Sequence, residues 1–336
     1  MIKILENKYD KKDVTQRYIE IITKSIDRLN LDFKYISNIK DIKKNDIVVT
    51  TNIDDAIKVL LLKKARVINW YQGIRPEESF IRNNSTLRKI VLDYIENFVL
   101  KKSLLNIFVS YGMKEYYFEK YSYNKQNYFI MPCFNTEINN IDKNKFNQKK
   151  LKFTYIGGLS KWQCIDETLK IYKEIENNNE DVFLKFLTPD IDNGRKLIEK
   201  YDIRNYDIKY VDNLLISNEL KDVKYGFLIR KEDPINYVST PTKLSTYLAN
   251  GIIPITTKNI YDVNKLMEDK VYKIFIDLNE DIENIARNII DKDKDINNEC
   301  DMLREYNDIF NEYYNEKNYI NQLSKCIREI IKEWKK

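Results

Sequence analysis

The amino-acid sequence predicts an α/β protein made of two domains, each with a parallel β-sheet. Short apolar runs of strand length alternate with segments of helical periodicity along the 336 residues, and such alternation is typical of parallel sheets with right-handed crossovers. A polar, lysine-rich stretch at 135–150 lacks periodicity and separates two series of these elements. The length suits two domains of ordinary size, because 43% hydrophobic residues allow each to bury a core.

The first series predicts a domain over residues 1–149. Its predicted strands are 2–6, 32–36, 46–50, 65–70, 106–110 and 128–131. Its predicted helices are 13–29, 54–64, 85–103 and 113–120.

The second series predicts a domain over 150–316, followed by a terminal helix over 317–336. The predicted strands are 151–156, 183–187, 208–211, 225–229, 252–257 and 272–276. The predicted helices are 161–177, 193–200, 216–221, 241–250, 282–291, 298–314 and 317–335.

The sequence contains no histidine, four widely spaced cysteines and no long apolar segment. The lack of imidazole excludes a Ser-His-Asp triad, a Cys-His pair and a histidine-ligated zinc site. A catalytic acid, base or nucleophile must therefore come from the other side chains. Since Cys133, Cys164, Cys300 and Cys326 form no C-x-x-C pair, we expect reduced thiols. No signal peptide or membrane-spanning window is recognisable, which favours a cytoplasmic location.

Charge is distributed unevenly, with about +10 over residues 1–150 and about −5 over the remainder. A basic N-terminal half favours contact with something anionic, such as the inner face of a membrane or a phosphate-bearing acceptor. The alternative is a solvated, lysine-rich surface. Nucleic acid is not an expected partner, because no basic stripe with interleaved aromatic residues and no known binding signature is present.

One stretch of the second domain predicts an anion site at the start of a helix. A strand leads into a charged loop that contains Arg230, and Ser239, Thr240 and Thr242 surround the predicted helix start, with Lys243 in the first turn. We expect Thr240 to cap this helix and the following proline to occupy its first position. Free backbone N–H groups, hydroxyls and an ammonium group together favour phosphate. The alternative is an ordinary, well-capped βαβ unit.

A glycine turn at the end of the second domain's first strand predicts another anion-ready helix start. Gly157 and Gly158 allow a ligand to approach the backbone, and Lys161 lies at the start of the next helix. Ser160 and Gln163 have the spacing of a capping box. The turn is neither a Walker A loop nor a G-x-G-x-x-G motif, but two such helix starts in one domain can flank a single diphosphate.

A polar loop follows the fourth predicted strand of the first domain and contains Gln72, Gly73, Glu77 and Glu78. Ligands of open α/β sheets bind at the carboxyl ends of the strands, so these side chains are predicted to face a cleft. Alternatively, the two glutamates cap the next helix. The helix at 85–103 is either a membrane-surface helix or one that packs on the sheet.

Three segments carry a family resemblance. They are Y-I-G-G-L-S-K-W at 155–162, then Arg230 with S-T-P-T-K at 239–243 and Y-L-A-N-G-I-I-P-I at 247–255, and finally W-Y-Q-G with P-E-E at 70–78. The second segment looks like the signature S-P-T-K-x-x-E-Y-L-A-x-G-x-P-V-I. Together they resemble retaining glycosyltransferases of the two-Rossmann (GT-B) type, most closely glycosyltransferase family 4 of bacterial surface-polysaccharide pathways.

The resemblance implies two Rossmann-like domains that face a cleft, with the terminal helix crossing back to the first domain. It implies a nucleotide-sugar donor on the second domain, with Lys161, Lys243 and Arg230 at its diphosphate. The implied donor-binding residues are Gly157, Gly158, Ser239, Thr240, Thr242 and Thr246.

A glycan or lipid-linked acceptor is implied on the first domain, beside Gln72 and Gly73, with Glu77 and Glu78 as acceptor-side carboxylates. In an inverting enzyme one of these glutamates would be the base, whereas retaining members need no protein base. Family members often work without a divalent metal, so we expect no metal and no cofactor other than the nucleotide-sugar co-substrate.

The chain departs from the family pattern at two positions. The glutamate that commonly holds the donor ribose is replaced by Thr246, and a partner glutamate eight residues earlier is replaced by Val238. Ribose recognition is therefore altered. This departure favours one alternative, a catalytically silent protein that binds a nucleotide or anionic glycan within an assembly complex. A nucleotide-sugar epimerase is a further alternative, although such enzymes usually use additional acidic and histidine groups.

Overall fold

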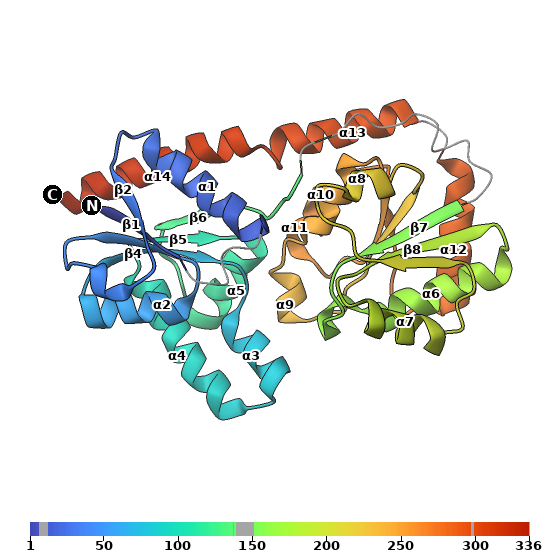
Figure 1. Cartoon of the computed structure of the whole chain (residues 1–336), viewed down its shortest axis with the longest axis horizontal. Helices are drawn as coiled ribbons and strands as arrows, with labels where there is room; N and C mark the ends of the chain where they lie inside the picture. Colours follow the sequence, from blue (N-terminus) through green and yellow to red (C-terminus); the bar gives the residue numbers. More distant parts are fainter. Residues whose placement is uncertain (7–12, 137, 139–150, 297–298, 336) are drawn as a thin grey trace. The chain divides into compact units, whose positions relative to one another are not determined.

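The computed structural model describes residues 1–6, 13–136, 138, 151–296 and 299–335. The chain forms two compact units. Unit 1 comprises Met1–Cys133, Tyr237–Thr240 and Asn315–Lys336, and unit 2 comprises Phe134–Asn236 and Pro241–Tyr314. Each unit contains a six-stranded parallel sheet flanked by helices (Figure 1), which confirms the predicted α/β class. Most of the predicted linker at 135–150 lies outside the described residues.

The sheet of unit 1 has a doubly wound order. Its strands are β1 (Ile2–Leu5), β2 (Phe33–Ile36), β3 (Ile47–Thr50), β4 (Arg66–Tyr71), β5 (Leu105–Phe108) and β6 (Tyr128–Ile130). They pair in the order β2-β1-β3-β4-β5-β6. Strands β1, β3 and β5 are buried throughout, which explains why each is mainly apolar in the sequence. The strand order reverses between β1 and β3, and ligands of such sheets bind at this switch point.

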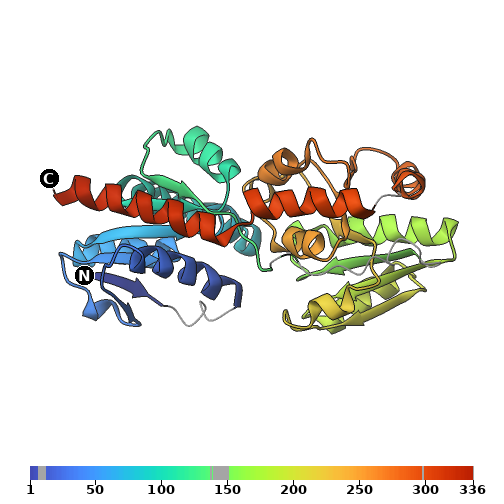
Figure 2. The same ribbon diagram turned by 90° about the horizontal axis from the view of Figure 1, so that it is seen from above.

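The helices of unit 1 cover its sheet and include the C-terminal helix. They are α1 (Asp13–Asp27), α2 (Ile53–Lys58), α3 (Arg75–Asn83), α4 (Thr86–Lys102), α5 (Tyr111–Tyr121) and α14 (Glu316–Lys335). Helix α14 packs along α1 (Figures 1 and 2). There, Glu316 accepts hydrogen bonds from Arg17 at 3.2 Å and Lys24 at 2.8 Å. The C-terminal helix therefore belongs to the first unit, as the sequence resemblance implied.

The sheet of unit 2 has the dinucleotide-binding order. Its strands are β7 (Leu151–Ile156), β8 (Val182–Leu187), β9 (Tyr206–Lys209), β10 (Tyr225–Leu228), β11 (Ile253–Thr256) and β12 (Ile274–Phe275). They pair in the order β12-β11-β10-β7-β8-β9. The order reverses between β7 and β10, so the ligand crevice of this unit is expected outside the carboxyl ends of these two strands.

The helices of unit 2 connect the parallel strands and follow the last one. They are α6 (Ile165–Asn178), α7 (Ile191–Lys200), α8 (Ile216–Glu219), α10 (Thr242–Ala249), α11 (Tyr261–Met267), α12 (Ile282–Asp295) and α13 (Glu299–Glu312). A short helix, α9 (Pro234–Tyr237), ends at the border between the units.

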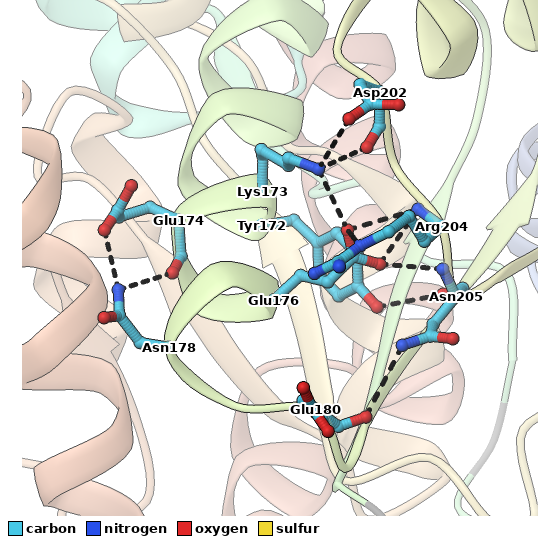
Figure 3. A network of polar contacts seen from close by, with 9 residues as sticks. All are labelled: Tyr172, Lys173, Glu174, Glu176, Asn178, Glu180, Asp202, Arg204 and Asn205. Carbon is cyan, nitrogen blue, oxygen red and sulfur yellow. Dashed lines mark hydrogen bonds and ion pairs between the residues drawn. The ribbon is translucent and has the colours of Figure 1, made fainter.

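A buried carboxylate fixes the turn between α7 and β9 (Figure 3). Glu176 of α6 is fully buried and accepts hydrogen bonds from the backbone N–H groups of Arg204 at 3.0 Å and Asn205 at 2.7 Å. Lys173 approaches the same carboxylate at 3.4 Å. Tyr172 donates to the carbonyl of Asn205 at 2.9 Å. The carboxylate thereby satisfies backbone donors that would otherwise be buried without partners.

The predicted helices differ from the observed ones where the backbone turns left-handed. The helix predicted at 161–177 begins as a 3-10 turn, Lys161–Gln163, and α6 starts only after Cys164, whose φ is +52°. The helix predicted at 54–64 consists of α2 and a π-helical turn, Val59–Lys63, which is followed by Lys64 with φ +51°. A non-glycine residue in this region interrupts regular helix geometry. Helices α3, α9 and α11 were not predicted, and α3 contains Glu77 and Glu78, which the sequence placed in a loop.

Candidate functional site

Two strand ends of unit 2 meet at the switch point of its sheet. Strand β7 runs into Gly157 and Gly158, and β10 runs into Ile229 and Arg230. Because β7 and β10 are parallel neighbours, the glycine turn and Arg230 lie side by side. The sheet topology therefore places two of the predicted donor-binding segments in one crevice.

Gln163 joins the two predicted cations of this crevice. Its side-chain Oε1 accepts hydrogen bonds from Arg230 Nη2 at 2.6 Å and from Lys243 Nζ at 2.9 Å. Its backbone carbonyl accepts from Arg230 Nη1 at 3.3 Å. The ammonium group of Lys243 also lies 4.1 Å from the centre of the Tyr155 ring, a cation–π contact. A guanidinium and an ammonium group thus share one neutral amide oxygen.

Both cations are buried without a countercharge among the described residues. Arg230 is 3% exposed and Lys243 is 7% exposed, yet neither forms an ion pair with a carboxylate in the described part of the chain. Burial, and then the nearby Arg230 charge, holds the pKa of Lys243 well below its usual value. Burial also lowers the pKa of Arg230. Buried charges are normally paired, so this arrangement favours an anionic ligand.

The glycine turn leaves its backbone beside the Lys243 ammonium group. Gly157 has φ +134°, a conformation that favours glycine. A Cβ atom at this position would lie 3.4 Å from Lys243 Nζ and 3.6 Å from the Tyr155 hydroxyl. The Tyr155 hydroxyl donates to the carbonyl of Gly158 at 2.6 Å, and a Cβ at Gly158 would meet no atom within 4 Å. The turn therefore leaves space at Gly158 and brings Gly157 beside the Lys243 ammonium group.

The loop after β11 holds the backbone of Arg230. The Thr257 hydroxyl accepts from the Arg230 N–H at 3.1 Å and donates to its carbonyl at 2.6 Å. Asn259 donates to the same carbonyl at 2.8 Å. Thr257, Asn259 and the linking role of Gln163 were not predicted. The position of Thr257 and Asn259 just after a strand end is the signal that could have identified these two residues.

Not all predicted residues of unit 2 join this cluster. Lys161 is exposed, and its side chain makes no hydrogen bond or ion pair with the residues that the structure describes. The predicted capping box at Ser160 and Gln163 is wrong, because Ser160 makes no side-chain cap bond and Gln163 binds Arg230 and Lys243 instead.

The predicted cap of α10 is also wrong. The N-cap residue is Pro241, and Thr240 belongs to unit 1, where its hydroxyl accepts from the Cys133 N–H at 3.0 Å. Ser239 likewise belongs to unit 1. The backbone hydrogen bond from Leu244 to Pro241 leaves the N–H groups of the preceding residues directed out of the helix end.

Thr246 takes part in a contact between α10 and the segment after β6, whereas Thr242 bonds within α10. Asn135 Oδ1 lies 2.9 Å from Thr246 Oγ1 and 3.0 Å from Ser245 Oγ. The Thr242 carbonyl lies 3.3 Å from the Thr246 hydroxyl. Thr246 is only 2% exposed. Thr246, which stands where the resembled signature has a glutamate, is therefore buried against Asn135.

In unit 1, a pocket of about 680 Å³ lies at the carboxyl ends of β3 and β4, beside the switch point. Gln72, Gly73 and Glu78 line it, together with Asp54 and Arg75. Burial raises the pKa of Glu78 above its usual range, against the opposing effect of nearby arginines. Three of the four residues predicted on the acceptor side thus lie around one pocket.

Glu77, the fourth, is held elsewhere. Its carboxylate lies 2.6 Å from Lys89 Nζ and 3.0 Å from Lys120 Nζ, and it accepts a hydrogen bond from Tyr116 at 2.9 Å. These partners belong to α4 and α5. They lower the pKa of Glu77, although burial opposes them. The structure thus gives Glu77 a place in a network between three helices.

Comparison with known proteins identifies the fold. No protein-family model and no curated protein matches the sequence. The chain is similar to sucrose-phosphate synthase from Thermosynechococcus elongatus, with a TM-score of 0.74 at 10% identity over 99% of both chains. A glycosyltransferase from Rickettsia africae gives 0.68 at 12% identity over 98% of both.

A variant of TarM from S. aureus, in complex with UDP and α-GlcNAc-glycerol among other ligands, gives a TM-score of 0.61 at 14% identity. The match covers 85% of this chain and 56% of TarM. At such low identity the likeness shows the fold alone. The chain has the two-Rossmann fold of GT-B glycosyltransferases.

Proposed function

We propose that this chain is a glycosyltransferase that transfers a sugar from a nucleoside-diphosphate donor to a glycan or lipid-linked acceptor. The observation that carries the proposal is the pair of buried cations, Lys243 and Arg230, which share the neutral oxygen of Gln163. A diphosphate would supply the missing negative charge. The UDP in the TarM complex and the topology of unit 2 support the same assignment.

The proposed reaction exchanges one bond at the anomeric carbon of the donor sugar. The bond from this carbon to the diphosphate oxygen breaks, and a bond to the acceptor oxygen forms. The acceptor proton passes to a phosphate oxygen of the departing nucleoside diphosphate. Negative charge grows on the diphosphate during this step, so Lys243 and Arg230 stabilise the transition state more than the bound donor.

We further propose that transfer retains the anomeric configuration, needs no divalent metal and serves cell-surface polysaccharide synthesis. Retention and metal independence follow from the sequence resemblance, and two fixed cations at the diphosphate suit a reaction in which a metal does not neutralise the leaving group. Lys161, Ser239, Thr240 and Thr242 remain proposed donor-side residues.

A thermal-shift screen of nucleoside diphosphates and nucleotide sugars tests the donor site. Binding to the folded state adds about 2.7 kcal/mol of stability at a ligand concentration near 100 Kd, so one diphosphate should raise the melting temperature clearly. The anion should raise the lowered pKa of Lys243, so the complex binds more protons than the free protein. By linkage, affinity should therefore fall as pH rises above the lowered pKa of Lys243.

The alternative of a silent binding protein gives a different result. Such a protein would show the same shift but would release no nucleoside diphosphate when an acceptor is added. The burial of Thr246 against Asn135 does not distinguish an enzyme from a silent binding protein, because recognition of the donor ribose is expected in both. Failure of every nucleotide to shift the melting temperature would contradict the proposed donor site.

We also propose that unit 1 attaches peripherally to anionic membranes through α4. Leu87, Ile90, Val91 and Tyr94 lie on one face of this helix and are exposed, Leu87 and Tyr94 at 75% each. Exposed basic residues flank this face, namely Arg88, Lys101 and Lys102. Such a combination is typical of binding at an anionic lipid surface. No described helix is both long and apolar enough to cross a bilayer.

Co-sedimentation with vesicles tests the membrane proposal. We expect binding to vesicles that contain phosphatidylserine and weak binding to pure phosphatidylcholine. Replacing Leu87 and Tyr94 with serine should reduce binding by about tenfold or more, since each loses a large apolar contact. Tyr111→Ser, which alters an exposed aromatic residue on α5, is the matched control. Equal binding of both variants would contradict the role of α4.

A further inference from the structure

The pocket of unit 1 is lined by more carboxylates than cations, although the sequence of the N-terminal half is basic. Residues 1–150 carry about +10, which by itself predicts a site for an anionic or phosphate-bearing acceptor. The pocket, however, is lined by three carboxylates and two guanidinium groups. These charged residues are Asp54, Asp55, Glu78, Arg75 and Arg82.

Both arginines of the pocket are already paired. Arg75 Nη2 lies 3.3 Å from Asp54 Oδ2, and Arg82 Nη2 lies 3.8 Å from Glu78 Oε2. The third carboxylate, Asp55, accepts from Asn52 Nδ2 at 3.0 Å and lies 3.3 Å from Lys58, which is not a lining residue. Unlike the cations of unit 2, those of the pocket are each matched by a carboxylate. A phosphate entering the pocket would have to break these pairs.

The Glu78 carboxylate at the pocket wall occupies space that any side chain at position 73 would fill. A Cβ atom at Gly73 would lie 2.0 Å from Glu78 Oε1, so only glycine leaves this position to the carboxylate. Burial already makes the charged form of Glu78 unfavourable and raises its pKa. A second anion nearby would add repulsion to this cost.

The polar groups that line the pocket are suited to hydroxyl groups. Carboxylates accept hydrogen bonds only, and the side chains of Asn52 and Gln72 offer both donors and acceptors. A sugar presents several hydroxyls that both donate and accept. A pocket of about 680 Å³ also has the size of a small-molecule site.

We propose that this pocket binds an uncharged, polyhydroxylated acceptor, a neutral saccharide terminus, and discriminates against phosphorylated ones. Asp54 and Glu78 accept hydrogen bonds from the saccharide hydroxyls. The same two carboxylates repel an acceptor phosphate, so one pair of side chains supplies both attraction and exclusion. The assignment of the ligand as an acceptor rests on the proposed glycosyltransferase function, whereas the ligand class rests on the pocket.

The test uses pairs of saccharides that differ only in one phosphate. Methyl glycosides of common neutral hexoses and N-acetylhexosamines are compared with their 6-phosphates, and binding to the full chain is measured by saturation-transfer NMR without any donor. We expect at least one neutral member to bind, and its 6-phosphate to bind about tenfold more weakly or worse. Equal or tighter binding of the phosphates, or no binding of any neutral saccharide, would overturn the proposal.

Two variants connect the binding to the pocket. Asp54→Asn combined with Glu78→Gln should weaken binding of the neutral saccharide by about tenfold and reduce the discrimination against phosphate. Gly73→Ala should also weaken binding of the neutral saccharide, because the added methyl group displaces the Glu78 carboxylate. Only the Glu78 side chain has to move, so we expect the fold to be kept. Glu115→Gln, which alters a carboxylate of α5 outside the pocket, should change nothing. Unchanged binding in both pocket variants would contradict the assignment.

The donor screen separates failure of this proposal from failure of the proposed function. Neutral-saccharide binding without any nucleotide binding would leave the ligand class intact and remove the glycosyltransferase function. Donor turnover with a preference for phosphorylated acceptors would remove the ligand class alone.

Discussion

Lys243→Met is expected to lower the turnover of the nucleotide-sugar donor by about 10²-fold or more. The substitution removes a positive charge that lies at the expected diphosphate position, and loss of one transition-state charge contact in a water-poor site has this magnitude. Arg230 and Gln163 keep their mutual hydrogen bonds, at 2.6 and 3.3 Å, so the local geometry persists. Steady-state release of the nucleoside diphosphate measures the effect.

The same variant should fold as well as the natural protein or better. Lys243 is buried, its burial lowers its pKa, and it is bound only by Gln163 and the Tyr155 ring among the described residues. Methionine fills a similar volume without the desolvation cost of an ammonium group, and such replacements are often neutral or stabilising. A drop in turnover with an unchanged or raised melting temperature identifies Lys243 as a functional residue. Full activity would show that the site is wrongly assigned, and a strong loss of stability would indicate a structural role.

Glu176→Ala is expected to destabilise unit 2 by about 3–5 kcal/mol. The carboxylate is fully buried and bound by two backbone N–H groups, a lysine and the Arg204 side chain. Its removal leaves the N–H groups of Arg204 and Asn205 without acceptors and also creates a small cavity. Urea denaturation followed by fluorescence should show a lower transition midpoint.

A neighbouring glutamate provides the control for this measurement. Glu174 lies on the same helix, where it accepts from Asn178 Nδ2 at 2.6 Å (Figure 3). That contact is exposed and local to the helix, so Glu174→Ala should change stability by less than about 0.5 kcal/mol. Similar losses from both variants, or a loss below about 1 kcal/mol from Glu176→Ala, would mean that the buried clamp contributes little.

The pattern of apolar residues was sufficient to predict both sheets. Fully buried parallel strands need apolar residues on both faces, so β3 and β10 can be recognised in the sequence as short, mainly apolar runs. The glycine turn after β7 and the cations after β10 and in α10 were also predictable, because strand ends and helix starts are marked by glycine, proline and hydroxyl residues. These are signals between residues close in the chain.

The partners of the predicted residues depend on contacts that no local pattern records. Glu77 and Glu78 are adjacent in sequence, yet one joins lysines of α4 and α5 and the other lines a pocket, because successive positions on a helix point in different directions. Thr240 has the composition of a helix cap but bonds to Cys133, which lies 107 positions away.

The sequence by itself therefore determined the α/β class, the two parallel sheets and the identity of the buried cations, Lys243 and Arg230. Only the tertiary structure showed that both meet at Gln163, 80 and 67 positions away along the chain. Sheet order decides which strand ends become neighbours, and β7 and β10 adjoin only because the order reverses between them. Sheet order also explains why the pocket of unit 1 is acidic although its sequence segment is basic. The fold brings a few particular side chains together at the strand ends, whatever the net charge of the segment.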